Sequence, residues 1–81
     1  MTDLQAYDVV EVISVPPLEG WPGLTTRSPR IGDTGTIVNI VPSSVTNEDA
    51  YLVECVGEDG NTIWLAFFKA DQLRVVRKAH L

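Results

Sequence analysis

The sequence predicts an all-β fold, a small barrel of five strands. Five short runs rich in Val, Ile, Tyr and Phe are separated by clusters of Gly, Pro, Asn and Asp, which is typical of strands joined by turns. No window of useful length has the apolar spacing of an amphipathic helix. Five short strands are too few for a sandwich, and closing them into a barrel leaves few exposed edges. We expect a single domain spanning residues 1–81.

The expected strands follow the runs of apolar and β-branched residues. They are placed at 7–14, 35–41, 51–56, 62–68 and 74–77. Between the last two strands, Ala70–Leu73 is too short for an α-helix and suits a single 3₁₀ turn.

A long first loop, from Val15 to Asp33, contains several Pro and Gly residues and Trp21. Loops longer than about 12–15 residues are uncommon in compact domains and are often functional. Proline lowers the entropy lost when such a loop is ordered, so we expect this one to be ordered. Trp21 is either packed onto the barrel as part of a lid or presented to a partner.

The hairpin between the third and fourth strands has two possible registers. A two-residue turn at 59–60 pairs Cys55 with Trp64 and mixes apolar and polar side chains on both faces. A three-residue loop at 58–60, with Gly60 in the left-handed region, shifts the pairing by one residue. Such a shift moves every side chain of the strand to the other face. The three-residue loop segregates the apolar residues better, and we therefore predict this second register.

In that register the core face holds Tyr51, Val53, Cys55, Ile63, Leu65 and Phe67. The opposite face holds Leu52, Glu54, Trp64, Ala66 and Phe68. Large exposed aromatic patches usually mark contact surfaces, so the predicted partner-binding residues are Leu52, Glu54, Trp64 and Phe68, with Trp21 added. Alternatively, the first loop or the C-terminal tail folds over this patch.

The net charge of −5 is unevenly distributed. The first 60 residues carry ten acidic and two basic side chains, whereas the last 21 carry four basic side chains and one acidic. Nucleic-acid binding requires a basic face, so we expect no nucleic-acid partner. A basic protein partner is easier to accommodate. A single cysteine, no leader near Met1 and no long apolar run favour a soluble, cytoplasmic protein without membrane partners.

The residues that usually carry catalysis are scarce. Cys55 lies on the predicted core face, and the single histidine, His80, is next to the last residue. One His and one Cys cannot form a zinc site, and the sequence contains no phosphate-binding glycine motif. We therefore expect no catalytic residues, no metal, no cofactor and no enzymatic activity.

Several segments together resemble a known family. They are Tyr7–Val10, Ile31–Val38 (IGDTGTIV), Tyr51–Glu54, Glu58–Gly60 and Ala70–Arg74. Over roughly residues 7–76 the chain is similar to a widespread small bacterial family of unknown function with a Src-homology-3-like, KOW-like barrel. The resemblance implies that barrel, whereas the Pro/Gly/Trp-containing first loop of this chain is longer than in typical members of the family. It also implies a short protein without established activity, and some members look like immunity partners of toxins.

Three hypotheses for function follow. The favoured one is a non-enzymatic protein-interaction module that forms a homo-oligomer through the exposed apolar face. The second is an acidic immunity or inhibitor protein that covers a basic toxin or enzyme. The third is a small-ligand-binding barrel with a cleft between the first loop and the strands.

Overall fold

A computed structural model describes residues 4–15, 27–42 and 48–79 of the chain. The described residues form five strands and one short 3₁₀ helix. These elements are β1 (Val9–Val12), β2 (Thr34–Val41), β3 (Ala50–Val56), β4 (Thr62–Phe68), η1 (Ala70–Gln72) and β5 (Leu73–Arg77). The all-β prediction is confirmed. No helix in the described ranges has the length and hydropathy needed to cross a membrane.

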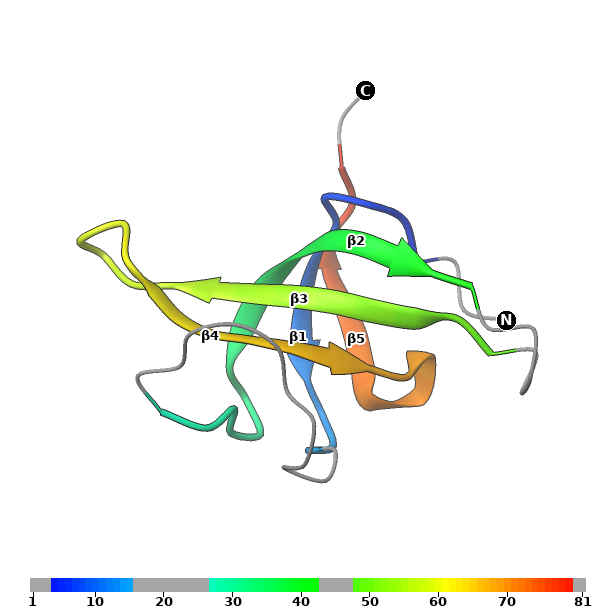
Figure 1. The fold of residues 1–81 in the computed structure, drawn as a ribbon, viewed down its shortest axis with the longest axis horizontal. Helices are drawn as coiled ribbons and strands as arrows, with labels where there is room; N and C mark the ends of the chain where they lie inside the picture. Colours follow the sequence, from blue (N-terminus) through cyan, green and yellow to red (C-terminus); the bar gives the residue numbers. More distant parts are fainter. Residues whose placement is uncertain (1–3, 16–26, 43–47, 80–81) are drawn as a thin grey trace.

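The strands form one antiparallel sheet in the order β4-β3-β2-β1-β5. In Figure 1 the sheet curls, so that β3 and β4 lie in front of β1 and β5. Within the described residues β4 and β5 do not pair with each other, and they are the two edges of the sheet. The five strands therefore form one unclosed sheet, and closure of the expected barrel is not confirmed. The reason is that β4 continues through η1 into β5, which turns away to pair with β1.

The predicted boundaries of β2 to β5 agree with the structure to within one residue, and η1 lies inside the predicted turn. The first strand is shorter than predicted because the chain turns just before it. Tyr7 has a φ of 71°, and its N–H donates to the carbonyl oxygen of Ile37 at 2.6 Å. The buried carboxylate of Asp8 accepts a hydrogen bond from the Gln5 N–H at 2.9 Å, which stabilises this turn.

The loop of the β3–β4 hairpin has the predicted geometry. Gly60 has a φ of 84°, and the Gly57 N–H donates to the carbonyl oxygen of Asn61 at 2.9 Å. The side chain of Asp59 accepts hydrogen bonds from the backbone and side-chain nitrogens of Asn61, both at 3.0 Å. A three-residue loop closed by a left-handed glycine is therefore confirmed.

The predicted strand register beyond this loop is wrong. Val56 pairs with Thr62, but the next pair is Cys55 with Trp64, so Ile63 is an extra residue on β4. Such a β-bulge places two residues of one strand opposite one residue of its partner. It shifts the remainder of β4 by one position, and every side chain from Trp64 onward changes face.

The core lies between the two halves of the curled sheet (Figure 1). Its buried hydrophobic members are Leu4, Val10, Val12, Ile37, Tyr51, Val53, Cys55, Trp64, Ala66, Phe68 and Leu73. Trp64 is 0% exposed and Phe68 is 2% exposed, and their rings pack with centroids 5.5 Å apart at a tilt of 55°. Tyr51, Val53 and Cys55 of β3 are buried, as predicted. The three predicted core residues of β4, Ile63, Leu65 and Phe67, are half-buried instead.

Candidate functional site

The face of β2, β3 and β4 that points away from the core is called the outer face below. Cross-strand partners share a face, so the register defines it. One row of partners crosses all five strands, from Arg77 on β5 through Val9, Thr36 and Glu54 to Leu65 on β4. Arg77 is exposed, and the other four side chains are half-buried. The row therefore has a basic side chain at its β5 end and a leucine at its β4 end, with a valine, a hydroxyl and a carboxylate between them.

A second row crosses the same face one step along the strands. It consists of Asn39 on β2, Leu52 on β3 and Phe67 on β4. Leu52 and Phe67 are directly opposite each other and half-buried, and Asn39 is exposed. Aromatic and aliphatic side chains in such cross-strand pairs are in contact. Leu52, Phe67 and the neighbouring Leu65 form the apolar part of the outer face.

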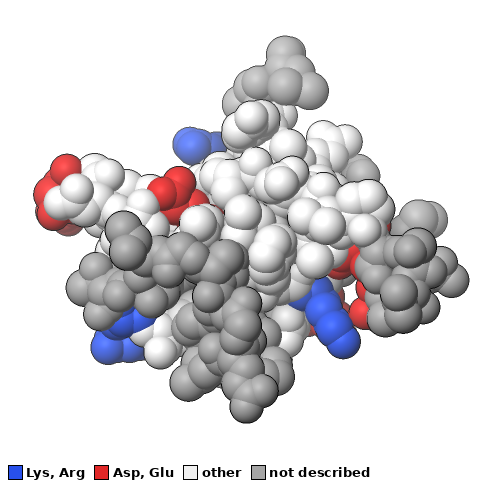
Figure 2. Space-filling model, in the orientation of Figure 1, with Lys and Arg blue, Asp and Glu red and all other residues white. Residues whose placement is uncertain are grey.

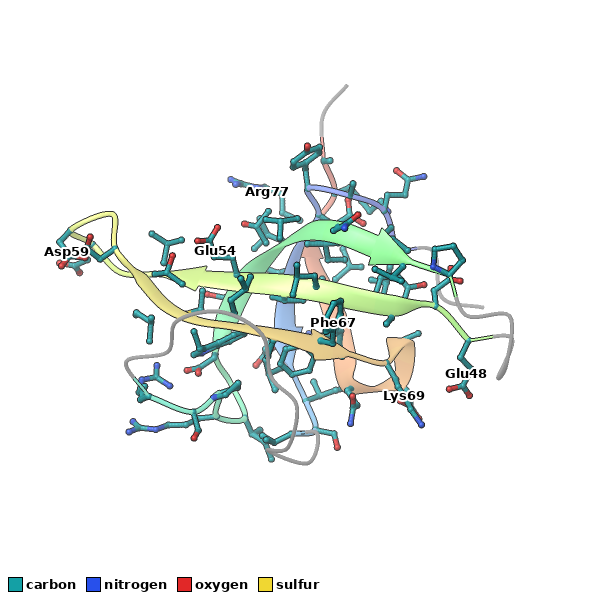
Figure 3. All side chains as sticks on the ribbon, in the orientation of Figure 1. Glu48, Glu54, Asp59, Phe67, Lys69 and Arg77 are labelled. Atoms are coloured by element: carbon teal, nitrogen blue, oxygen red, sulfur yellow. The ribbon has the colours of Figure 1, made fainter. Side chains whose placement is uncertain are left out.

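The outer face carries little charge. Glu54 is the one charged residue in β2, β3 and β4 together, all of which lie within the described ranges. Figure 2 shows uncharged atoms over most of the middle of the described surface, with acidic and basic atoms mainly at its margins. In Figure 3, Phe67 lies near the middle of the view and Arg77 is drawn beside Glu54, whereas Glu48 and Lys69 lie toward the right-hand edge and Asp59 lies at the hairpin tip.

The Glu54 carboxylate is held in place from β4. The hydroxyl of Thr62 donates to its Oε2 atom at 2.5 Å. This bond connects the two strands of the hairpin next to the bulge and orients the carboxylate on the outer face. A hydrogen bond to one carboxylate oxygen leaves the other oxygen able to accept bonds from an incoming donor.

A hollow lies beside Glu54 on the outer face. Its volume is about 200 Å³, and it is lined by Val9, Thr34, Gly35, Thr36, Glu54 and Val56. A Cβ atom at Gly35 would lie 2.7 Å from the carbonyl oxygen of Glu54, so only glycine allows β2 to approach β3 this closely. Pockets for drug-sized ligands measure roughly 300–1,000 Å³, so the hollow suits a single side chain better than a separate small molecule.

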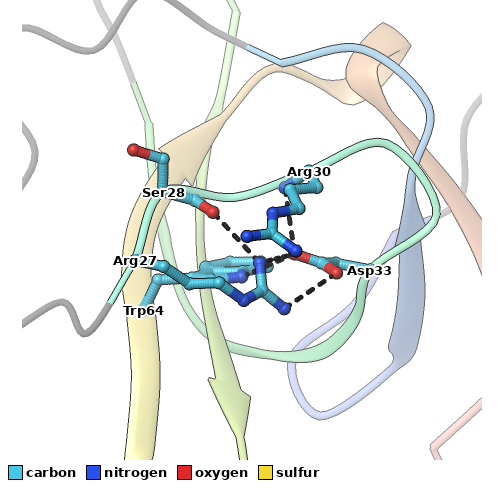
Figure 4. A network of polar contacts seen from close by, with 5 residues as sticks. All are labelled: Arg27, Ser28, Arg30, Asp33 and Trp64. Atoms are coloured by element: carbon cyan, nitrogen blue, oxygen red, sulfur yellow. Dashed lines mark hydrogen bonds and ion pairs between the residues drawn. The ribbon is translucent and has the colours of Figure 1, made fainter.

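The other side of the hairpin is fixed by the network around Asp33 (Figure 4). The carboxylate of Asp33 accepts two hydrogen bonds from the guanidinium of Arg27, at 2.7 and 3.1 Å. It also accepts one from the Arg30 N–H and one from the indole Nε1–H of Trp64, both at 2.9 Å. The network satisfies the polar atom of the buried Trp64, as burial of a tryptophan requires.

The same network shifts the pKa of Asp33. The bonds from Arg27 lower the pKa most; partial burial opposes them, and the bonds from Arg30 and Trp64 add to the decrease. The resulting pKa is about 2. Asp33 is therefore a carboxylate throughout the neutral and mildly acidic range, and it acts as a structural anchor for the end of the first loop.

Asp8 is a second anchor, and it is 0% exposed. It accepts hydrogen bonds from Lys78 Nζ at 2.7 Å and from the Ala79 N–H at 2.8 Å. Burial by itself raises the pKa of Asp8, but the bonds from Lys78, Ala79 and Gln5 outweigh this effect and lower it overall. The carboxylate thereby attaches the chain after β5 to the turn before β1.

The structure separates the predicted partner-binding residues into two groups. Leu52 and Glu54 lie on the outer face, as expected. Trp64 and Phe68 lie in the core, because the bulge at Ile63 reverses their direction. Their predicted exposure is wrong, and a partner that binds the surface cannot contact them. Trp21 lies outside the described residues. Sequence reasoning missed Leu65 and Phe67, which take the outer positions on β4.

The described residues give little basis for catalysis. Cys55 is buried, and burial raises the pKa of its thiol, which disfavours the nucleophilic thiolate. No group of three or more His, Cys, Asp or Glu side chains within the described ranges is arranged to hold a metal ion. His80 lies outside those ranges.

Comparisons with known proteins add no assignment. No family model matches the chain, and no curated protein and no solved structure matches it either.

Proposed function

We propose that this chain is a non-enzymatic protein-interaction module that binds its partner through the outer face. One observation carries the proposal: Leu52, Leu65 and Phe67 adjoin Glu54 on a face whose three strands carry no other charge. Interface centres are depleted in charged residues and enriched in aromatic ones. The anchored Trp64 beneath supports this role, because a rigid sheet positions surface residues better than a loop does.

The proposed partner is a different protein that presents a basic group among apolar ones. The expected homo-oligomer rested on exposure of Trp64 and Phe68, and both are buried. Two copies joined symmetrically through the outer face would bring two Glu54 carboxylates into one interface, and each copy carries a net charge of −5. Like charges brought together at an interface disfavour association. A basic partner, as in the immunity or inhibitor hypothesis, removes this repulsion.

The proposal includes the fold type and location inferred from the sequence. The strand order and the 3₁₀ turn before β5 support a Src-homology-3-like arrangement. The single cysteine supports a bacterial, cytoplasmic protein. The hollow of about 200 Å³ gives less support to the small-ligand-binding alternative.

A matched pair of surface variants tests the proposal. The wild-type chain captures candidate partners from cells, and each candidate is purified and its affinity measured by calorimetry. We expect Phe67→Ala to weaken binding about 30-fold, as loss of a central aromatic anchor does. Val76→Ala, at an exposed position of the edge strand β5, should leave the affinity unchanged. Equal affinities of all three proteins for every purified partner would rule out the outer face as the contact surface.

A further inference from the structure

We propose that the hollow beside Glu54 is the binding site for one arginine side chain of the partner. The inference rests on the proposed function and specifies the chemistry that the outer face recognises. It concerns the row Val9, Thr36 and Glu54 rather than the apolar row of Leu52 and Phe67.

The shape of the hollow fits a long side chain with a polar end. Val9 and Val56 supply aliphatic surface, and Val56 is 48% exposed. Gly35 contributes backbone alone, because β2 and β3 approach each other too closely for a side chain at this position. The three methylenes of an arginine bury well along aliphatic surface while the charged head stays at a polar site.

The charge of the hollow also favours a cation. Glu54 is its one charged lining residue, and β2, β3 and β4 contain no lysine or arginine. Arg77 of β5 lies opposite Val9, but it does not line the hollow and none of the ion pairs among the described residues joins it to Glu54. The nearest carboxylate on β1, that of Glu11 opposite Thr34, is already paired with Arg74 of β5. Glu54 therefore remains the acceptor for a cation from outside.

The arrangement of acceptors favours arginine over lysine. Glu54, Thr34 and Thr36 all line the same hollow, so one carboxylate and two hydroxyl-bearing side chains border it. A guanidinium has five N–H donors in a planar fork and can contact several acceptors at once, whereas an ammonium is a compact point charge. Charge-assisted hydrogen bonds of this kind are about twice as strong as neutral ones. A metal ion is disfavoured, because one carboxylate supplies too few ligands.

Two short peptides test the inference without knowledge of the partner. One contains a single arginine flanked by leucines, and the other carries citrulline, which keeps the shape and removes the charge. Each is titrated into the labelled full chain at low salt while backbone amide shifts are followed by NMR. We expect the arginine peptide to shift the amides of Gly35, Thr36 and Glu54 and to bind about 10-fold more tightly than the citrulline peptide.

Two variants test whether Glu54 is responsible for the preference for the arginine peptide. Glu54→Gln keeps the size of the side chain and should abolish the preference for arginine, whereas Glu58→Gln, at the exposed hairpin tip, should leave it intact. Equal binding of the arginine and citrulline peptides would overturn the inference. So would an unchanged preference in Glu54→Gln, or equal binding of a third peptide that carries lysine in place of the arginine.

These outcomes are separable from failure of the proposed function. Equal binding of both peptides with shifts confined to Leu52, Leu65 and Phe67 would overturn the arginine site and leave the interaction surface supported. Absence of any shift on the outer face would also overturn the arginine site. The surface itself is then decided by the Phe67→Ala affinity measurement.

Discussion

The two faces of the β3–β4 hairpin are made from alternate residues of the same two strands, yet they do different things. The inner face buries Tyr51, Val53, Cys55, Trp64, Ala66 and Phe68. The outer face has Leu52, Glu54, Leu65 and Phe67, all of them half-buried. Both faces are apolar in composition, apart from Glu54. Hydrophobicity alone thus does not distinguish the core from the candidate interface. The bulge at Ile63 determines which side chains of β4 are buried.

What stabilises the inner face is specific pairing of polar atoms as well as burial. The indole N–H of Trp64 has a partner in Asp33, which also binds Arg27 at the end of the first loop. Nothing equivalent holds Phe67 on the outer face, where the described polar contact is the bond from Thr62 to Glu54. The inner face is therefore fixed by the fold, and the outer face is the one that we propose for partner binding.

Deletion of single residues from β4 tests the bulge itself and has the largest expected effect. Deletion of Ile63 removes the extra residue and leaves Trp64 opposite Cys55, so the protein should fold with a loss of about 1–2 kcal/mol from reduced packing. Deletion of Leu65 instead moves Phe68 to the outer face, and we expect the chain to be unfolded. Circular dichroism and urea denaturation distinguish the two. Equal stability of both deletion variants would contradict the bulged register.

A smaller effect comes from two neighbouring phenylalanines on opposite faces. Phe68→Ala should lower the free energy of unfolding by about 3–5 kcal/mol, because the side chain is buried against Trp64. Phe67→Ala should cost about 1 kcal/mol, because its side chain already contacts solvent in part. Urea denaturation measures both. The reverse order is what the register predicted from sequence requires, and observing it would restore that register.

The smallest expected effect concerns the anchor under the inner face. Asp33→Asn keeps an acceptor for Trp64 and removes the ion pair with Arg27, and should cost about 1–2 kcal/mol at neutral pH. Because the folded-state pKa of about 2 lies below the ordinary value of 3.8, the folded protein binds fewer protons. The stabilisation is therefore complete above about pH 4 and is lost as the pH falls toward 2.

The difference in free energy of unfolding between wild type and Asp33→Asn should consequently decrease as the pH falls from about 4 toward 2. Urea denaturation at pH 7, 4, 3 and 2 measures it. Asp8 also has a lowered pKa, but it is unchanged in both proteins and cancels from the difference. Asp71→Asn, an exposed position in η1, serves as the control and should show no such trend. A difference that stays constant down to pH 2 would show that the charge of Asp33 is not what stabilises the fold.

The sequence by itself determined the local features of this protein. Strand positions follow from runs of β-branched and aromatic residues, and the hairpin loop follows from Gly60, which adopts a left-handed backbone at little cost. The same alternation correctly placed Tyr51, Val53 and Cys55 in the core and Leu52 and Glu54 on the outer face. These features depend on interactions between residues close in sequence, and such interactions can be predicted from local sequence patterns.

Only the tertiary structure decided which face of β4 is buried. With apolar residues at every position from Ile63 to Phe68, shifting β4 by one residue buries either Leu65 and Phe67 or Trp64 and Phe68, and both alternatives are apolar. The choice depends on partners distant in sequence. Burying Trp64 places its N–H at Asp33, 31 residues away, and its ring against Phe68, and the bulge at Ile63 accommodates the resulting shift. No local pattern encodes that hydrogen bond.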